Sequence, residues 1–239
     1  MFEAHNLSSR IKTFFSNTWE LVRTPLIGLI APPRGQTCFD RFVNISIRRL
    51  SPQEFSLLAP QLVEIYIEAM DYNDSIRVSR THAWRREISH PGFSAVVATT
   101  DSGIVGLAYG FLGSPDTWWD RQLRRGFYEK GGPTEQQWAL LRSYFELAEV
   151  HVRPGIQNHG IGRQLITELL WNVPAAYVAL STPEVPQEGN SAFGLYRSLG
   201  FRDALRHHRY PGDSRPFALL YAPLPLPAVA QHRTAARDR

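Results

Sequence analysis

Hydrophobic and polar residues alternate over positions 44–50, which predicts a first strand. The next four residues, Ser51-Pro-Gln-Glu54, have the form of a capping box with proline at the first helical position. Apolar residues then recur on one helical face as far as Ala69, so a helix is expected there. A second helix is predicted over 75–88, where His90-Pro91-Gly92 ends it.

Two β-rich runs follow, over 93–99 and 104–111. The Thr-Asp-Ser-Gly sequence between them has the length and residue types of a hairpin loop, so the two runs should pair antiparallel. Residues 114–143 interrupt this rhythm with many aromatic residues, too many for a disordered linker. We expect an ordered insertion that holds two short helices.

The remaining pattern predicts a strand over 144–152, a glycine-containing turn, a helix over 160–171 and a strand over 175–180. A helix over 191–199 and two final strands, around 205–210 and 217–221, complete the series. A strand, helix and strand in succession imply a parallel pair, because the crossover helix returns the chain in the same direction. The pattern therefore predicts an α/β fold with a central mixed sheet flanked by helices.

The 239 residues are consistent with one domain over 44–222, an N-terminal extension over 1–43 and a flexible proline-rich, basic tail over 223–239. The net charge of +4 favours phosphate-bearing ligands without requiring nucleic acid. The single cysteine, Cys38, excludes an intramolecular disulfide framework and fits a cytoplasmic protein. No apolar stretch is long enough to span a bilayer.

The extension carries apolar residues at helical spacing, which predicts an amphipathic helix. It would pack on its own domain or on a partner, which is compatible with a homodimer; a membrane-surface anchor is the alternative.

The candidate chemistry begins where the strand over 144–152 runs through a turn into the helix at Gly160. Free main-chain N–H groups at the start of a helix, beside two glycines, form a phosphate-binding geometry. A side chain at either glycine would block the close approach of a phosphate to the main chain. The sequence is not a Walker loop, and Gly160-Ile-Gly162 lacks the third glycine of a dinucleotide fingerprint.

Two motifs resemble those of one family. Gln157-x-x-Gly160-x-Gly162 is similar to the acyl-CoA loop of the GNAT (GCN5-related N-acetyltransferase) superfamily. The sequence from Ala192 to Phe201, Ala-Phe-Gly-Leu-Tyr-Arg-Ser-Leu-Gly-Phe, resembles the family's later helix and turn. The resemblance covers roughly residues 44–221 and implies a sheet splayed at the acyl-CoA site, an acetyl-CoA donor and an amine acceptor.

The resemblance also implies site residues. Coenzyme A would be held by the loop and the strand before it, and Tyr196 would protonate the departing thiolate as general acid. Asn190 departs from the family spacing and is alternatively a helix cap. The candidate cofactor-binding residues are Val150, His151, Val152, Gln157, Asn158, His159, Gly160, Ile161, Gly162, Arg163, Asn190 and Tyr196.

A carboxylate is expected to accept a proton from the acceptor amine. Glu149 and Glu146 are the candidates, and their odd spacing puts them on opposite faces of a regular strand. A bulge, which relatives carry here, would change that parity. We favour Glu149, with Glu146, or a water relay using His151, as alternatives.

The resemblance places the acceptor near the first helices, the aromatic insertion and the last hairpin. Acidic and aromatic side chains there would attract and cover a cationic amine. The candidates are Asp71, Tyr72, Asp74, Trp118 and Trp119. We expect a small-molecule amine, with a protein lysine or N-terminus, or a non-catalytic acyl-CoA sensor, as alternatives.

Other classes fit the sequence less well. His207 and His208 are adjacent and without a partner at ligand spacing, so no metal is expected. Arg121, Arg124 and Arg125 are more typical of a solvated face than of a nucleic-acid site, so no nucleic-acid partner is expected.

Overall fold

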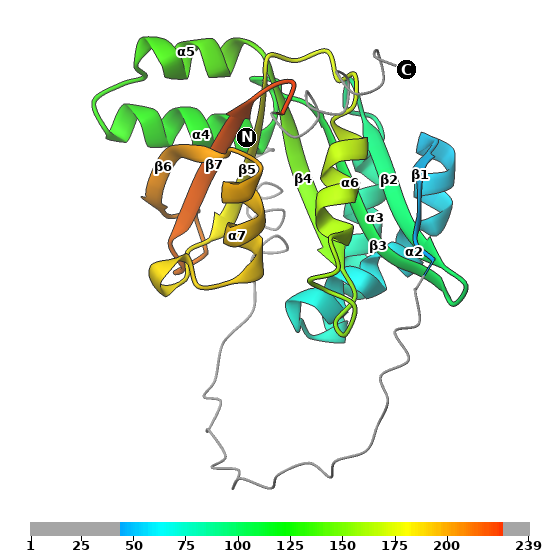
Figure 1. The fold of residues 1–239 in the computed structure, drawn as a ribbon. Coiled ribbons are helices and arrows are strands. Elements are labelled where there is room, and N and C mark those ends of the chain that lie inside the picture. Colours follow the sequence, from blue (N-terminus) through cyan, green and yellow to red (C-terminus); the bar gives the residue numbers. More distant parts are fainter. Residues whose placement is uncertain (1–43, 227–239) are drawn as a thin grey trace, which may run out of the picture.

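The computed structural model describes residues 44–226, so the predicted N-terminal extension, Cys38 and most of the predicted tail lie outside the described residues. The described chain forms a seven-stranded mixed sheet in the order β1-β2-β3-β4-β5-β7-β6 (Figure 1). The strands are β1 (Ser46–Leu50), β2 (Ser94–Thr100), β3 (Gly103–Leu112), β4 (Tyr144–Val152), β5 (Tyr177–Pro183), β6 (Arg202–His208) and β7 (Phe217–Pro223). The predicted α/β class and mixed sheet are confirmed.

Two helices cover one face of β1–β4. Helix α2 (Pro52–Met70) begins with the predicted capping box, in which the Ser51 N–H donates to Glu54 Oε2 at 2.8 Å and the Glu54 N–H donates to Ser51 Oγ at 3.2 Å. A short 3₁₀ turn (Asp74–Ile76) leads into α3 (Arg77–Glu87). The buried core on this side includes Phe55, Leu62, Ile65, Trp84 and Leu107.

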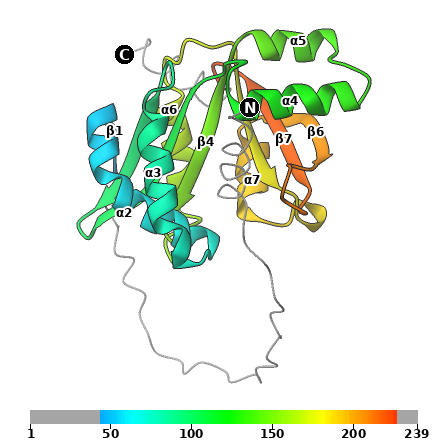
Figure 2. The same cartoon turned by 180° about the vertical axis from the view of Figure 1, so that it is seen from behind.

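The opposite face carries α6 (Ile161–Leu169) and α7 (Ser191–Ser198), and Figures 1 and 2 show α6 and α3 on opposite sides of the sheet. The apolar stripe of α6 packs on the buried side chains of β2–β4, whereas α7 packs beside β5 and β7. A second 3₁₀ turn (Pro186–Glu188) precedes α7.

The aromatic insertion forms two helices, as predicted: α4 (Trp118–Glu129) and α5 (Glu135–Arg142). They cover β5–β7 (Figure 2), and their apolar faces build a third core cluster that includes Trp119, Leu123, Phe127, Leu140 and Tyr221. The predicted strand over 205–210 instead spans Arg202–His208. The shift arises because Gly200, at φ 88°, makes the turn that starts the strand.

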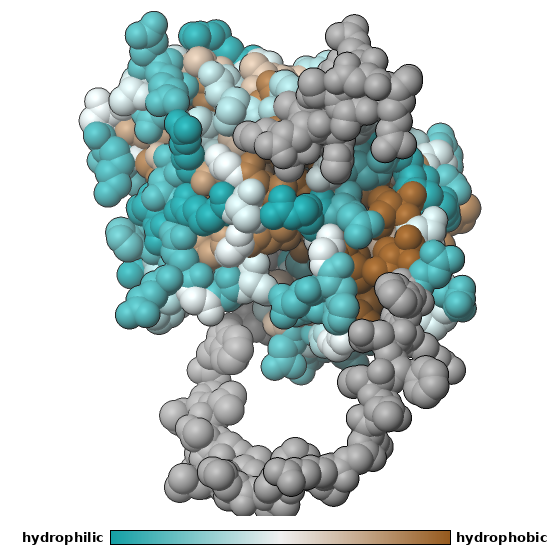
Figure 3. Space-filling model, viewed as in Figure 1, coloured by the Kyte–Doolittle hydropathy of each residue, from teal (hydrophilic) through white to brown (hydrophobic). Residues whose placement is uncertain are grey.

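The sheet opens in its centre. Parallel strands β4 and β5 pair only through Tyr144–Tyr177, Phe145–Val178 and Glu146–Ala179. Beyond Glu146 the two strands separate, whereas β3 still pairs with β4 as far as Val152. In Figure 3, apolar surface is visible between the parts of the molecule that carry α6 and α7. The fold therefore leaves one edge of the second half of β4 free of a strand partner.

Candidate active site

A β-bulge sets the direction of the acidic side chains on β4. Glu149 lies opposite Tyr109 and Glu146 lies opposite Phe111, because the register shifts at Ala148. Tyr109 and Phe111 are two residues apart and share one face of β3, so Glu146 and Glu149 also share a face. The bulge that the resemblance implied is present, so the two side chains do not lie on opposite faces as they would on a regular strand. Both point toward α2 and α3.

Glu149 stands just beyond the last β4–β5 pair. Its Oε2 lies 2.6 Å from His151 Nε2, the next side chain on the same face. The ring of His151 packs edge-on against Tyr66 of α2, with 5.0 Å between centroids, and the Arg80 guanidinium lies 4.9 Å from the centre of the Tyr66 ring. Glu149 keeps about a fifth of its side chain exposed, at 20%. Glu149 is thus an accessible carboxylate, and one of its oxygens contacts His151.

Glu146 differs from Glu149 in its environment. Only 8% of it is exposed, and its Oε2 lacks a hydrogen-bond partner among the described residues. Burial raises the pKa of Glu146 well above the ordinary carboxyl value, and the charges of Glu87, Asp120 and Glu149 add to the effect. Burial therefore favours the protonated form of Glu146.

Tyr196 approaches the opening from the other half of the sheet. Asn190 accepts the Phe193 N–H at 2.9 Å and caps α7, which fixes the helix that carries Tyr196. Tyr196 is 8% exposed, and burial, with the charge of Glu149, raises the pKa of its phenol. The charge of Glu149 reaches the Tyr196 phenol, so the two sequence-predicted catalytic groups lie within electrostatic range of each other.

The loop before α6 leaves main-chain groups free for a ligand. Gly160 precedes α6 with φ 77°, and the helix start carries no side-chain cap. A Cβ at Gly160 would meet no atom within 4 Å, whereas one at Gly162 would lie 3.0 Å from Leu195. Space at Gly160 and uncapped N–H groups fit a phosphate, as the sequence predicts.

The other loop residues contribute in different ways. The Gln157 side chain donates to the Val152 carbonyl at 2.9 Å, and His159 Nδ1 lies 2.8 Å from the Gln157 carbonyl. Arg163 donates to Ser198 Oγ at 2.7 Å and ties α6 to α7. Asn158 takes a left-handed conformation, at φ 65°. The side chain of Ile161 is buried in the core at 2% exposure, so only its main chain is available to a ligand.

Val150, His151 and Val152 lie on the part of β4 that β5 does not pair. Val150 and Val152 pack against the core on the α6 side, whereas the His151 ring contacts Tyr66 on the other side. Their main-chain groups on the open edge are the ones that a pantetheine arm would pair with, in the manner of a strand.

The candidate acceptor residues fall into two groups. Asp71, Tyr72 and Asp74 lie together after α2, where the Tyr72 ring packs 5.3 Å from Tyr66 and Arg77 donates to Asp74 at 2.8 Å. The Tyr72 phenol also interacts with Arg215 of the β6–β7 loop. This group therefore adjoins the Glu149–His151 pair.

The tryptophans form the second group. The Trp119 indole is 9% exposed and donates to Ser181 Oγ at 3.3 Å, and Trp118 packs 5.2 Å from Tyr210. The expectation that Trp119 covers an acceptor amine is not supported by this burial, because its indole belongs to the core under α4. Trp118 is half-buried beside it.

Sequence reasoning missed the charged side chains of α3. Arg80 and Glu87 stand seven residues apart, on the same helix face as the buried Trp84. Burial and the charge of Glu149 raise the pKa of Glu87 to about 7. The spacing of Arg80 and Glu87 from Trp84, four residues before it and three after it, places both on the face of α3 that the tryptophan buries, and this spacing could have identified them from the sequence.

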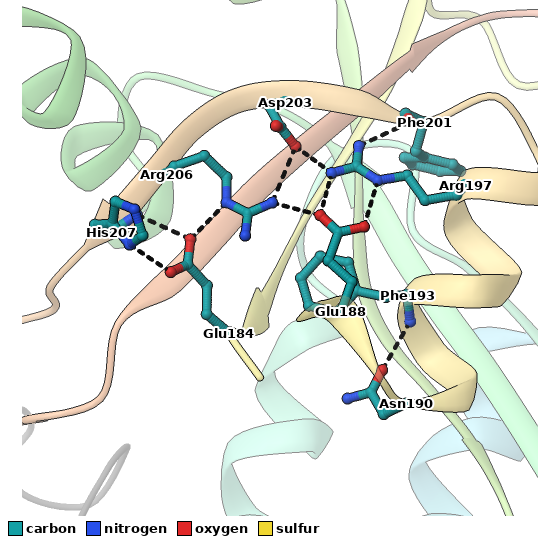
Figure 4. Close-up of polar contacts among 9 residues, drawn as sticks. All are labelled: Glu184, Glu188, Asn190, Phe193, Arg197, Phe201, Asp203, Arg206 and His207. Carbon is teal, nitrogen blue, oxygen red and sulfur yellow. Dashed lines mark hydrogen bonds and ion pairs between the residues drawn. The ribbon is translucent and has the colours of Figure 1, made fainter. Parts of the chain in front are cut away.

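An ion-pair network braces the β5–α7 loop (Figure 4). Arg197 donates to Glu188 Oε1 at 2.6 Å, and Arg206 lies 2.5 Å from the same oxygen. Arg206 also donates to Glu184 at 2.7 Å, and Glu184 accepts the His207 N–H at 2.9 Å. The network joins the loop to both α7 and β6, and it lies next to Tyr196 in sequence through Arg197.

The opened mixed sheet and the glycine loop at a helix start, with Glu149 on β4 and Tyr196 on α7, are the features expected of a GNAT-type acetyltransferase. No family model matches the chain. The chain is 33% identical over 199 residues to the GCN5-like protein acetyltransferase Rv2170 of Mycobacterium tuberculosis, an alignment that covers 74% of this chain and 97% of that relative. The chain therefore belongs to the GNAT superfamily and is an acetyltransferase of that family.

Solved structures share the fold. A GNAT-family protein from Desulfovibrio desulfuricans aligns with a TM-score of 0.51 at 17% identity, over 75% of this chain and 99% of that chain. A GNAT phosphinothricin acetyltransferase from Sinorhizobium meliloti, in complex with acetyl-CoA, aligns with a TM-score of 0.50 at 16% identity, over 75% and 88% of the two chains.

Residues 44–226 contain neither a membrane-spanning helix nor a metal-binding cluster. None of the helices there is long and apolar enough to cross a membrane. In the same range, no group of three or more histidine, cysteine, aspartate or glutamate side chains is placed to hold a metal ion.

Proposed function

We propose that this chain transfers an acetyl group from acetyl-CoA to an amine, by direct attack within a ternary complex. The observation that carries the proposal is the opening between β4 and β5 beyond Glu146, with Glu149 on β4 and Tyr196 on α7 within electrostatic range of each other. The loop over 157–163 would hold the pyrophosphate, and the unpaired edge of β4 over 150–152 would hold the pantetheine arm. The thioester would then lie between the two catalytic groups.

The reaction requires two proton movements. Glu149 accepts one proton from the acceptor ammonium, and the neutral amine attacks the thioester carbonyl. Main-chain N–H groups on the open edge of β4 stabilise the oxyanion that forms. The C–S bond then breaks, Tyr196 protonates the thiolate, and a second proton from the amine nitrogen restores the phenol. The products are the amide, the free thiol of coenzyme A and one proton.

Glu149 is the better candidate for the base than Glu146. A base must be ionised and within reach of the amine. Glu149 is partly exposed, whereas Glu146 is buried where its protonated form is favoured. The contact between Glu149 and His151 Nε2 also allows a relay through the imidazole. In this assignment Glu146 supports the site without exchanging a proton with substrate.

The acceptor that we propose is a small-molecule amine. Its positive charge would be attracted by Asp71, Asp74 and Glu149, and Tyr72 would lie against it. A protein lysine or N-terminus is the second candidate, and it is favoured by the M. tuberculosis relative, which is described as a protein acetyltransferase.

Calorimetry followed by thiol detection tests the proposal. We expect saturable binding of acetyl-CoA to the purified chain, and release of coenzyme A thiol when spermidine, tyramine, kanamycin or a lysine-containing peptide is added. The best member of this panel identifies the acceptor class. Binding without thiol release would indicate an acyl-CoA sensor, and absence of binding would refute the proposal.

A further inference from the structure

A group of titratable side chains extends from the cleft to the protein surface. It begins at Glu149, continues at Glu87 on the inner face of α3, and ends at His90 in the turn after that helix. Trp84, at 1% exposure, anchors α3 on the sheet one turn before Glu87. The buried tryptophan therefore fixes the side of α3 that carries Glu87.

Tyr109 is the common neighbour of this group. Its phenol is 2% exposed and interacts electrostatically with Glu149, Glu87, Arg80 and Glu146. The Trp84 ring packs 5.2 Å from the Tyr109 ring, and the His90 ring stacks on Phe111. The end of α3 that carries Glu87 therefore lies over the β3 residues that pair with Glu149 and Glu146. This places Glu87 close to the base although the two residues are 62 positions apart in the sequence.

The charges in this region do not balance when every carboxyl group is ionised. The charged and titratable neighbours of Glu87 come from its own helix and from the sheet. On α3 and the following turn they are Arg80, Arg86 and His90. On the sheet they are Glu146 and Glu149 of β4 and Tyr109 of β3. Arg80 is the buried cation among them. Adjacent carboxylates cannot all ionise in a desolvated site, so the group retains at least one proton. Burial raises the pKa of Glu146 well above its ordinary value and raises the pKa of Glu87 to about 7, so Glu87 is the carboxyl group that exchanges its proton near neutral pH.

His90 connects Glu87 to solvent. Its Nε2 lies 3.2 Å from Glu87 Oε2, and 35% of its side chain is exposed. The ring stacks on Phe111 with 4.3 Å between centroids, which holds it in place above the carboxyl group. Burial lowers the pKa of His90, so the imidazole is neutral at pH 7 and able to accept a proton.

We propose that Glu87 and His90 carry the proton taken up by Glu149 out to the solvent. This rests on the proposed function, in which each turnover releases one proton. Glu149 passes the proton to the ionised Glu87, Glu87 passes it to His90 Nε2, and the imidazolium releases it to bulk water. Glu149 is then again an ionised base. No bond other than those to the moving proton changes.

The first test needs no acceptor. Infrared spectra of the acetyl-CoA-saturated protein, taken from pH 5 to 9, should contain a protonated-carboxyl band with a midpoint near 7. The band should be absent from Glu87→Gln, which has the shape of a protonated glutamate and should fold. A Glu87 that is already ionised throughout this range would overturn the proposal.

The second test measures turnover with the best acceptor from the amine panel. In weak buffer, Glu87→Gln and His90→Asn should each reduce kcat by about tenfold, below the roughly 10²–10⁴-fold range of a direct general base. Added imidazole buffer should restore kcat in both variants, because a diffusible base replaces the missing side chain. A purely structural defect would not respond to buffer. Glu129→Gln on α4 is the matched control and should retain wild-type kcat in either buffer.

The outcomes separate the two proposals. Unchanged kcat of Glu87→Gln in weak buffer, or a loss that imidazole leaves in place, overturns the relay while thiol release by the wild type still supports the transferase. If the wild type acetylates no member of the panel, the transferase proposal fails and the relay fails with it. If Glu149→Gln is fully active, the assigned base is wrong and the relay is overturned, while thiol release still supports the transferase.

Discussion

Two carboxyl groups three residues apart on β4 differ in environment because one is buried and the other reaches the cleft. Glu146 lacks a hydrogen-bond partner for Oε2 among the described residues, so ionisation would leave a buried charge without compensation. Glu149 has its charge next to His151 and partly in contact with solvent. Replacing each glutamate in turn by glutamine should therefore distinguish the role of Glu149 from that of Glu146.

We predict that Glu149→Gln lowers kcat/KM by about 10²–10⁴-fold, the range expected for loss of a general base. Glu146→Gln should lower it far less, since glutamine resembles the protonated carboxyl group already present. Steady-state thiol release measures both. The reverse order of the two losses would assign the base to Glu146.

Tyr196 provides a second prediction at this scale. Because burial and the charge of Glu149 raise the pKa of the phenol, it keeps its proton throughout the neutral and moderately alkaline range and can donate it to a thiolate. Tyr196→Phe should lower kcat by about 10²-fold or more while the Kd for acetyl-CoA changes little. Turnover that is unaffected when acetyl transfer is rate-limiting would remove the general-acid role and leave Tyr196 as a packing residue beside Phe201.

At the scale of elements, the start of α6 combines an open glycine with uncapped N–H groups. We predict that Gly160→Val weakens acetyl-CoA binding in calorimetry, because the side chain would occupy the space that the phosphate needs. The left-handed φ of 77° adds a strain of about 1–2 kcal/mol, which should lower Tm as well.

Gly131 supplies the matched control for this prediction. It lies in the loop between α4 and α5 with φ 102°, and a Cβ there would also meet no atom within 4 Å. Gly131→Val should therefore lower Tm through the same backbone strain and leave the Kd for acetyl-CoA unchanged. Equal Kd values for the two variants would contradict phosphate binding at Gly160.

The elements themselves were largely predictable. The capping box at Ser51 and the strand over 144–152 agree with the structure because each depends on local spacing. The bulge at Ala148 depends on pairing with β3, so counting residues did not reveal which way Glu146 points. The inward face of α3 was missed for a related reason: Arg80 and Glu87 are polar, and only packing on the sheet makes them interior residues.

At the scale of the whole molecule, the opening of the sheet divides the described chain into two halves. Three residue pairs between β4 and β5 join the two halves. The hydrogen bond from Arg163 to Ser198 also joins α6 to α7. The half that carries Tyr196 must therefore stabilise its own loops. The network of Glu184, Glu188, Arg197 and Arg206 does this by tying the β5–α7 loop to α7 and β6 (Figure 4).

This network should make stability depend on pH. Hydrogen bonds from Arg197, then Arg206, lower the pKa of Glu188 to about 2, from an ordinary value of 4.5. A carboxyl group whose pKa is lower in the folded state stabilises the fold above its unfolded pKa, and the contribution is lost as the pH falls from about 4.5 to 2. We predict that Glu188→Gln lowers Tm at pH 7 and that the difference in Tm from wild type narrows steadily below pH 4.5, as measured by thermal melts followed by circular dichroism.

Asp101→Asn, at the exposed turn between β2 and β3, is the control and should match the wild-type Tm at each pH. A difference for Glu188→Gln that stays constant down to pH 2.5 would mean that the ion pairs of Figure 4 contribute nothing to stability through their charge, and that the β5–α7 loop is held in place by packing alone.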